Sequence, residues 1–290
     1  PAIHLNLSAA SNPTLMLRLL SRTLALSALL VAGLSAATKP HIVFVMADDM
    51  GWGETSYNGH PELKTPNLDA LAAAGLRLNH FYTAHFNCSP TRASIMTGRH
   101  PHRMGTFGPG SPIRAQEVTV AKVLQAAGYA TGIVGKWGLG EPGTTGIPNR
   151  KGFDHWFGYL NNDLAEDHFP ETIWRNEQEI TLPGNVGGKR GQYSNDLMTE
   201  EALAFIDDHR TKPFFLYLAY TIPHSLLEVP EASLRAHLAR LERTRRERDG
   251  EAVADALTGL REAAARPGSS ESNLMPHFLR CAAAYATLGE

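Results

Sequence analysis

Residues 41–49 read HIVFVMADD, and this stretch gives the strongest indication of the fold. The unbroken apolar run at residues 42–46 is typical of a central strand that is buried on both faces of a parallel sheet. It leads directly into two acidic residues, Asp48 and Asp49. Functional side chains of open α/β sheets gather at the carboxyl ends of strands. The stretch therefore predicts a buried strand that brings two carboxylates to a site.

The rest of the chain alternates short apolar runs with helical patterns. Further strands are predicted at residues 76–82, 130–134 and 214–219, and helices at 66–74, 119–127 and 195–208, with another that starts at Ser89-Pro90. This alternation predicts an α/β fold with a mostly parallel sheet and helices on both faces. Residues 141–191 are rich in Gly, Pro, Asn and aromatics, which predicts long surface loops over a pocket, and the aromatics of residues 152–159 are interpreted as a structural loop or pocket wall.

The charge of the chain is balanced. A formal net charge of -2 over 290 residues gives no overall field that would attract nucleic acid or an anionic membrane, so no nucleic-acid partner is expected. A basic run at residues 243–248 is interleaved with acidic residues. This pattern favours a solvated helix face over a nucleic-acid patch.

Residues 1–37 are expected to comprise upstream residues and a secretory signal peptide. Arg18 and Arg22 precede an apolar run at residues 24–34, and the small residues Ser35-Ala36-Ala37 follow as a cleavage site. The alternatives are a membrane anchor or a buried helix, but the run is shorter than the roughly 20 residues that span a bilayer. We therefore expect an exported protein, periplasmic or secreted, with no stable membrane anchor.

Residues 88–99 read CSPTRASIMTGR, which contains the pattern Cys-x-Pro-x-Arg. This segment resembles the signature of the sulfatase family, formylglycine-dependent type I enzymes of the arylsulfatase kind, in which the pattern directs oxidation of the cysteine to formylglycine (3-oxoalanine). The acidic pair about forty residues upstream also resembles the family. The resemblance runs from about residue 39 to residue 230, and it implies an alkaline-phosphatase-like α/β fold.

The resemblance implies a specific use for Cys88. One hydroxyl of the aldehyde hydrate attacks sulfur, and the second expels sulfate by collapse back to the aldehyde, which splits one difficult step into two. A formylglycine-generating enzyme is then a partner. From the residues alone, Cys88 has two other readings, a disulfide with Cys281 and a buried thiol.

The resemblance also assigns a metal. Asp48, Asp49 and the modified Cys88 are expected to coordinate one divalent cation, Ca²⁺ or Mg²⁺, because hard oxygen ligands suit these ions. The alternative is a pair of strand-end acids that accept hydrogen bonds from backbone donors.

Three further residues match catalytic positions of the family. Arg92 lies one helical turn from Cys88 and is expected to bond the modified side chain or the sulfate, Lys136 matches the sulfate-binding lysine, and His224 matches the histidine that contacts sulfate or protonates the leaving oxygen. Without the resemblance, the alternatives are a surface salt bridge, an exposed loop lysine and a structural histidine.

The chain departs from the family pattern in two respects. Many members carry a histidine two residues after the sulfate-binding lysine, where this chain has Gly138, and His168 is a candidate to replace it. Members also carry an Asp-Asn pair on a later strand, and this chain contains no Asp-Asn dipeptide. We therefore expect residues 38–230 to form the N-terminal catalytic core, and residues 231–290 to be a helical, diverged and truncated end of the same domain.

The sequence thus predicts a sulfuric ester hydrolase that acts on a sulfated small molecule or glycan. Two alternatives remain. One is hydrolysis of phosphate or phosphonate esters at the same kind of site. The other is a catalytically incomplete fragment that binds sulfated ligands.

Overall fold

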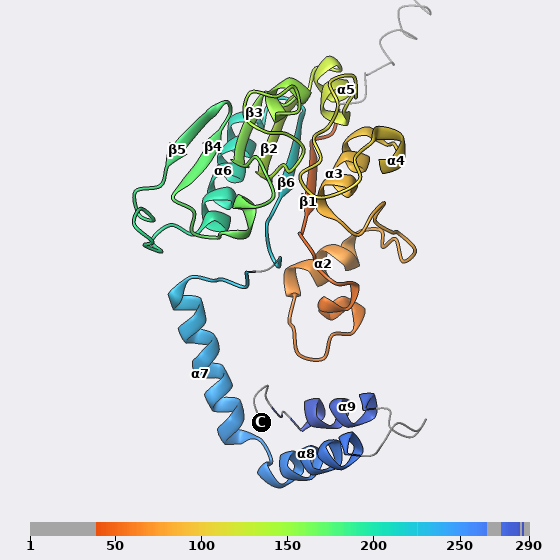
Figure 1. Ribbon diagram of the computed structural model, residues 1–290, viewed down its shortest axis with the longest axis vertical. Coiled ribbons are helices and arrows are strands. Elements are labelled where there is room, and N and C mark those ends of the chain that lie inside the picture. The colour runs from red at the N-terminus through yellow and green to blue at the C-terminus, as the bar shows by residue number, and fades with distance from the viewer. Residues whose placement is uncertain (1–38, 225, 266–273, 285, 287–290) are drawn as a thin grey trace, which may run out of the picture. The chain divides into compact units, whose positions relative to one another are not determined.

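A computed structural model describes residues 39–224, 226–265, 274–284 and 286 (Figure 1). The expected signal peptide at residues 1–37, and a loop expected at residues 267–270, lie outside these described residues. The chain divides into two compact units at the bond between Ile42 and Val43. All features described below belong to the second unit, apart from the first residue of strand β1.

A six-stranded sheet forms the centre of the fold, with the strand order β1-β6-β2-β3-β4-β5. Its strands are β1 (Ile42–Met46), β2 (Ala130–Lys136), β3 (His155–Tyr159), β4 (Thr172–Arg175), β5 (Gln178–Thr181) and β6 (Phe214–Ala219). Strand β2 runs parallel to both β6 and β3, whereas β4 and β5 pair antiparallel. The sheet is therefore mixed, with parallel strands at its centre and an antiparallel hairpin at one edge.

Eight α-helices lie in the described part of the chain. They are α2 (Pro66–Ala74), α3 (Cys88–Thr97), α4 (Pro101–Met104), α5 (Val120–Ala126), α6 (Ser194–His209), α7 (Glu231–Glu247), α8 (Gly250–Ala264) and α9 (Met275–Ala283). Thr119 caps α5 by accepting a hydrogen bond from the Lys122 amide, and Gly98 ends α3 in the left-handed conformation. The helices predicted from the sequence are confirmed, with ends displaced by one or two residues.

The hydrophobic core lies between the sheet and α6. Strand residues Val134, Phe157 and Leu216 pack with Met198 and Phe205 of α6, all of them buried. A side chain of this size contributes about 1.5–3 kcal/mol when it is fully buried. Successive residues of β2 point to opposite faces of the sheet. Val134 lies on the face that packs against α6 and forms this core.

Gly132 allows α6 to approach β2 closely. A Cβ atom at this position would lie 2.7 Å from ring atoms of Phe205. Helix α5 also contacts β2, and α3 contacts α5. The start of α3 is thereby placed near the carboxyl end of β2, where the predicted site residues follow the strands.

Strand β1 was predicted to be buried and central, and this is wrong. It lies at an edge of the sheet as described, with β6 as its neighbour, and Val45 is 57% exposed. An apolar run shows that a strand tolerates burial on both faces. Actual burial also requires that other secondary-structure elements pack on each face of the sheet. Within the described residues, such cover does not reach Val43, Phe44 and Val45, which all remain exposed.

The predicted strand at residues 76–82 is also wrong. These residues form turns and irregular backbone, and Leu76, Leu78 and Phe81 are exposed. The apolar pattern was compatible with a strand, but a strand also requires a partner for its backbone groups. No strand pairs with this segment in the part of the chain that the structure describes.

Residues 141–191 are more ordered than the predicted surface loops. They contain β3, β4 and β5, and the aromatic residues Trp156 and Phe157 of β3 are buried rather than part of a loop or pocket wall. The three strands are short and include polar residues and Gly158, so composition alone indicated loops. Pairing with β2 determines their conformation.

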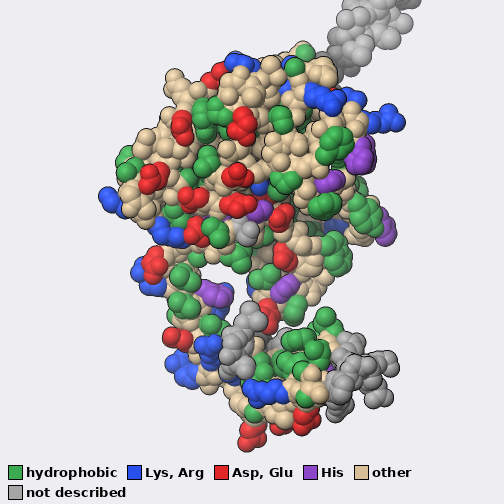
Figure 2. Space-filling model, viewed as in Figure 1, with side chains coloured by type: hydrophobic (Ala, Val, Ile, Leu, Met, Phe, Trp, Pro, Cys, Tyr) green, Lys and Arg blue, Asp and Glu red, His purple; other side chains and the backbone are tan. Residues whose placement is uncertain are grey.

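The helical prediction for residues 231–265 is confirmed by α7 and α8. Helix α7 has no buried residue, and α8 contacts α9. The basic run lies mostly on the exposed surface of α7, as expected for a solvated helix face. Figure 2 shows acidic and basic side chains interspersed on the face that it draws. None of the described helices combines the length and the apolar character that crossing a membrane requires.

Candidate active site

The site lies where β1, β6 and β2 end side by side. Asp48 follows β1, Lys136 is the last residue of β2, and His224 follows β6. The Asp48 amide donates a hydrogen bond to the Ile222 carbonyl at 3.1 Å, which joins the segments that follow β1 and β6. Cys88 approaches as the first residue of α3. The structure thus brings Asp48, Lys136, His224 and Cys88 together at one edge of the sheet.

Asp48 is the electrostatic centre of the site. Its carboxylate is buried and accepts a hydrogen bond from Arg92 Nη2 at 3.0 Å and another from Lys136 Nζ at 2.7 Å. Burial would raise the pKa of Asp48, but the charges of Arg92 and Lys136 outweigh it and hold the pKa below its ordinary value of 3.8. Two buried cations thus share one buried carboxylate.

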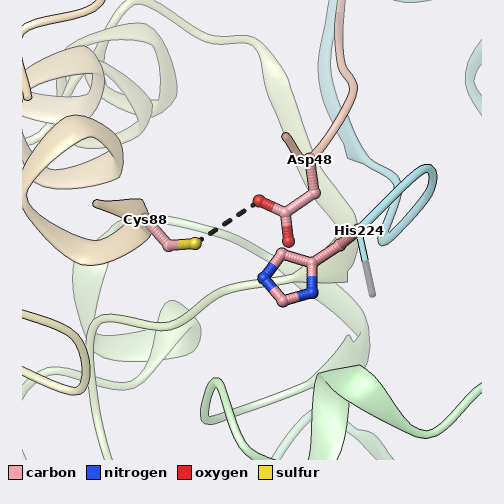
Figure 3. Close-up of side chains that lie close together, drawn as sticks. All are labelled: Asp48, Cys88 and His224. Carbon is pink, nitrogen blue, oxygen red and sulfur yellow. Dashed lines mark hydrogen bonds between the residues drawn. The ribbon is translucent and has the colours of Figure 1, made fainter. Parts of the chain in front are cut away.

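Cys88 is half-buried, and its sulfur atom faces the Asp48 carboxylate (Figure 3). Its thiol donates to Asp48 Oδ1 at 3.6 Å, and Lys136 Nζ lies 3.5 Å from Sγ. Burial raises the pKa of the Cys88 thiol, although the charge of Lys136 opposes this shift. Cys88 and Cys281 are both free cysteines, so the disulfide alternative is not present in this structure.

Arg92 connects the three elements that form the site. In addition to Asp48, it donates from Nη1 to the Lys136 carbonyl at 2.5 Å and to the Tyr217 hydroxyl at 3.4 Å. Its side chain and that of Lys136 are 1% and 2% exposed. The readings of Arg92 as a surface salt bridge and of Lys136 as an exposed loop lysine are therefore wrong. Uncompensated burial of such cations costs several kcal/mol, so the carboxylate between them is essential.

Asp49 differs from its neighbour in both exposure and conformation. Its side chain is 59% exposed, and its backbone has φ 60°, a left-handed conformation that is uncommon for residues other than glycine. Its Oδ2 lies 3.3 Å from Nε2 of His224, whose side chain is mostly buried. His224 lies close to Asp48 and Cys88, whereas Asp49 contacts the cluster through its pairing with His224.

The donor atoms are close enough to hold a metal ion. Ligand atoms of Asp48, Cys88 and His224 all lie within 4.8 Å of one another (Figure 3). Asp49, the second expected carboxylate ligand, is the chain neighbour of Asp48 and is not part of this group. Carboxylate oxygens suit a hard cation such as Ca²⁺ or Mg²⁺, and an oxidised residue 88 would add oxygen in place of sulfur. The residues present therefore fit a divalent cation.

Sequence reasoning missed three residues that support the site. Tyr217 contacts Arg92 from within β6, Ser89 follows Cys88, and Asn162 donates to the Ser89 hydroxyl at 2.9 Å. Ser89 occupies a variable position of the Cys-x-Pro-x-Arg pattern, and Tyr217 reads as an ordinary apolar strand residue. No signal in the sequence could have identified Asn162, because its role depends on a contact across 73 positions.

His168, the candidate substitute for the missing histidine at position 138, is buried beside α6. Its Nδ1 lies 3.2 Å from Asn195 Nδ2 and 3.3 Å from Thr221 Oγ1. These hydrogen bonds connect it to α6 and to the segment after β6, and not to Cys88 or Lys136. Its role as a substitute stays a prediction.

A family comparison agrees with this geometry. The family model described as Sulfatase matches residues 40–249, most of the chain and all of the site residues. The chain belongs to the sulfatase family. The predicted family and the predicted α/β fold are therefore confirmed.

Relatives of this chain include two mammalian proteins. The chain is 36% identical to N-acetylgalactosamine-6-sulfatase of Mus musculus over 228 residues, which are 70% of this chain and 43% of that protein. It is 41% identical to Arylsulfatase G of Homo sapiens over 240 residues, 69% of this chain and 44% of that protein. The chain thus spans less than half the length of these curated relatives.

A solved structure gives the same result. The crystal structure of Ps i-CgsB in complex with k-i-k-neocarrahexaose aligns with a TM-score of 0.59 and 31% identity, over 69% of this chain and 48% of that one. A second family model, described as Methylmalonyl-CoA mutase, matches residues 218–290 and overlaps the sulfatase match. It covers about a quarter of the chain, and the expectation that residues 231–290 are a diverged end of the sulfatase domain stays a prediction.

Proposed function

We propose that this chain is the N-terminal catalytic part of a sulfuric ester hydrolase that cleaves sulfate esters. One observation carries the proposal. Two buried cations, Arg92 and Lys136, meet a buried carboxylate and residue 88 at the junction of three strand ends, with Lys136 Nζ 2.7 Å from Asp48 Oδ2 and 3.5 Å from Cys88 Sγ. Such preorganised positive charge is what a sulfate group in transfer requires.

Residue 88 acts in this proposal after its oxidation to formylglycine, with Cys88 Sγ of this structure standing in for a hydroxyl oxygen of the hydrate. The hydrate supplies a hydroxyl nucleophile and a second hydroxyl that allows release, which a cysteine or serine lacks. Support comes from the Cys-x-Pro-x-Arg pattern of residues 88–92 and from the half-exposed position at the start of α3. A formylglycine-generating enzyme would act on this segment.

A divalent cation, Ca²⁺ or Mg²⁺, would be held by Asp48, Asp49 and residue 88. It would supply additional positive charge to polarise the sulfate oxygens. The family generally uses such an ion, and the two adjacent carboxylates fit it chemically. His224 is close enough to the same donors to contribute, although nitrogen is a less usual ligand for calcium.

The remaining roles follow from position. Lys136 and Arg92 stabilise the charge on the sulfate, Lys136 directly and Arg92 by holding Asp48 and the β2 carbonyl in place. His224, paired with Asp49 Oδ2 at 3.3 Å, holds a proton that it can give to the departing alcohol oxygen. These residues together bind the anion, orient residue 88 and supply the proton.

We propose a sulfated small molecule or glycan as the substrate. Relatives include an enzyme named N-acetylgalactosamine-6-sulfatase, and Ps i-CgsB was solved with k-i-k-neocarrahexaose. We also propose that the protein is exported, periplasmic or secreted, on the basis of the signal-like segment at residues 1–37. The leaving-group side of the site is not specified by any transferable sequence code.

The test combines chemistry at residue 88 with activity. The full chain is produced in a host that generates formylglycine, and the tryptic peptide of residues 78–92 is analysed by mass spectrometry. Hydrolysis of 4-nitrophenyl sulfate and of 4-nitrophenyl phosphate is then measured side by side. We expect the aldehyde mass, preferential sulfate hydrolysis and calorimetric binding of Ca²⁺.

Two cysteine variants provide a matched comparison. Cys88→Ala should lower kcat about 10³-fold or more, because it removes the nucleophile. Cys281→Ala changes the other free cysteine, on α9, and should leave kcat within about twofold. An unmodified thiol at residue 88 in material that has no sulfatase activity would refute the proposal, as would a larger kcat for the phosphate ester.

A further inference from the structure

Ser89, the residue after Cys88, joins three segments through one hydroxyl group. Its Oγ donates to the Gly138 carbonyl at 2.7 Å and accepts hydrogen bonds from the Gly110 amide at 3.0 Å and from Asn162 Nδ2 at 2.9 Å. A serine hydroxyl has one donor and two acceptor sites, so its capacity is fully used. Ser89 is completely buried. The start of α3 is therefore fixed at the position where residue 88 enters the site.

Asn162 supplies one of these bonds from a buried position that no catalytic assignment explains. It is 7% exposed, follows β3, and its Oδ1 has no hydrogen-bond partner among the described residues. A buried polar atom without a partner costs about 1–3 kcal/mol. Such a cost at the edge of a site indicates that the side chain is required there.

Asn162 also occupies the space next to position 138. A Cβ atom built on Gly138 would lie 2.5 Å from Asn162 Oδ1, so any larger residue at position 138 requires Asn162 to shift. The nearest atom of any other residue, Arg92 Cδ at 3.7 Å, is at an ordinary van der Waals distance. Gly138 also has φ 69°, which disfavours other residues. Asn162 and Gly138 are therefore mutually dependent.

We propose that Asn162 is a positioning residue of this site. Through the Ser89 hydroxyl it fixes the start of α3 against the segment that follows β2, which holds residue 88 beside Lys136, and its side chain fills the space that a residue larger than glycine would need at position 138. The importance of this arrangement for catalysis rests on the proposed function. The arrangement itself can be measured without any turnover.

The first experiment measures how accessible residue 88 is. The full chain is expressed without formylglycine generation, so that residue 88 remains a thiol, and iodoacetamide labelling of the 78–92 tryptic peptide is followed by mass spectrometry. Asn162→Ala should label about fivefold faster than the unchanged chain, the ratio that corresponds to one net hydrogen bond. Ser89→Ala should label faster by a similar ratio, and the double variant should show little further increase, because both changes remove the same bond.

Asn162→Leu separates the hydrogen bond from packing. Leucine has the same number of side-chain heavy atoms as asparagine, leaves no cavity and lacks the donor, so it should label as fast as Asn162→Ala, and it tests the proposal even where alanine prevents folding. Asn185→Ala is the control, because Asn185 is equally buried and bonds the Pro170 and Gln192 carbonyls away from residue 88. It should leave the labelling rate of residue 88 unchanged.

The outcomes are distinct. Equal labelling of the unchanged chain and of both Asn162 variants would overturn the proposal, as would equal acceleration by Asn185→Ala, since that would indicate general loosening. The Cys281 peptide in the same digest reports such loosening separately. A chain that shows the expected rates but hydrolyses no sulfate ester would refute the proposed function and leave the positioning role intact.

The second experiment tests the mutual dependence of positions 138 and 162. Gly138→Ala is made in the unchanged chain and in the Asn162→Ala background, and the melting temperature of each protein is measured. The drop caused by Gly138→Ala should be smaller in the Asn162→Ala background, because the 2.5 Å contact is absent there. Equal drops in both backgrounds would show that Asn162 does not restrict position 138.

Discussion

Strands β1 and β6 are neighbours in the sheet and are almost equally apolar, yet they lie in different environments. All six residues of β6 are buried, whereas Val43, Phe44 and Val45 of β1 are exposed. The difference arises from what covers them. Strand β6 has a strand on either side and α6 packed against it, while β1 has β6 as its neighbour in the described sheet.

The difference in burial between β1 and β6 does not extend to the residues that follow their carboxyl ends. Asp48, two residues beyond β1, is as buried as the core, because Arg92 and Lys136 reach it from α3 and β2. The exposed strand is therefore followed by a buried carboxylate. Burial at the site is produced by side chains that converge on the strand end, and not by the strand itself.

The largest expected effect tests this separation between strand and site. Asp48→Asn should lower the free energy of unfolding by about 3–5 kcal/mol, because it leaves two buried cations without their carboxylate. Asp49→Asn is the matched control, and should change stability by less than about 0.5 kcal/mol, because Asp49 is exposed and asparagine tolerates the left-handed conformation. Urea unfolding measures both. Similar losses of unfolding free energy in the two variants would mean that Asp48 is as exposed to solvent as strand β1.

A second pair of variants compares the strands directly. Leu216→Ala in β6 should cost about 2–5 kcal/mol, because it removes a fully buried side chain and leaves a cavity. Val45→Ala in β1 should cost less than about 1 kcal/mol, since this side chain is already 57% exposed. Chemical denaturation of both proteins measures the two losses of unfolding free energy. Equal costs would show that β1 is covered in solution.

The contact between the strands predicts a smaller effect. The rings of Phe44 and Tyr217 stack with centroids 5.4 Å apart, which is the principal apolar link between β1 and β6 side chains that the structure describes. Phe44→Ala should cost about 1–1.5 kcal/mol. Phe81→Ala, at an exposed position outside the sheet, is the control and should be neutral in the same denaturation assay. A neutral Phe44→Ala would indicate that the two strands do not depend on each other.

The smallest effect concerns the helix that covers β6. Glu201 of α6 bonds His155 of β3 and Arg175 of β4, at 2.8 and 2.5 Å. Burial would raise the pKa of Glu201, but these bonds and the charge of Arg175 hold it below its ordinary value of 4.5. A carboxyl with a lowered pKa stabilises the folded state above its unfolded pKa, and loses this contribution as the pH falls through the folded pKa.

The unchanged chain should therefore exceed Glu201→Gln in stability at neutral pH by about 0.5–1 kcal/mol, a modest value because Arg175 is half exposed to solvent. The difference should disappear as the pH falls below 4.5. Denaturation midpoints of the two proteins between pH 7 and pH 3 provide the measurement. A difference that grows on acidification would contradict the assigned ion pairs.

Much of the site could be predicted because strand ends can be recognised in a sequence. The apolar runs before Asp48 and Lys136 indicated where strands stop, and parallel strands bring their ends to one edge. Arg92 was expected near Cys88 from helical spacing alone. Its burial, and its bonds to Asp48 and Tyr217, could not be predicted, because they depend on which face of α3 packs against the sheet.

The sequence alone determined the apolar runs, the alternation of helices and strands, and the chemistry available at Asp48, Cys88, Lys136 and His224. These properties are local, because periodicity and residue type are written within a few positions. The tertiary structure decided that β1 is an edge strand, that residues 76–82 form no strand, and that Asn162 meets Ser89 and excludes a side chain at position 138. Burial and contact depend on which distant segments share space, and no short stretch of sequence contains that information.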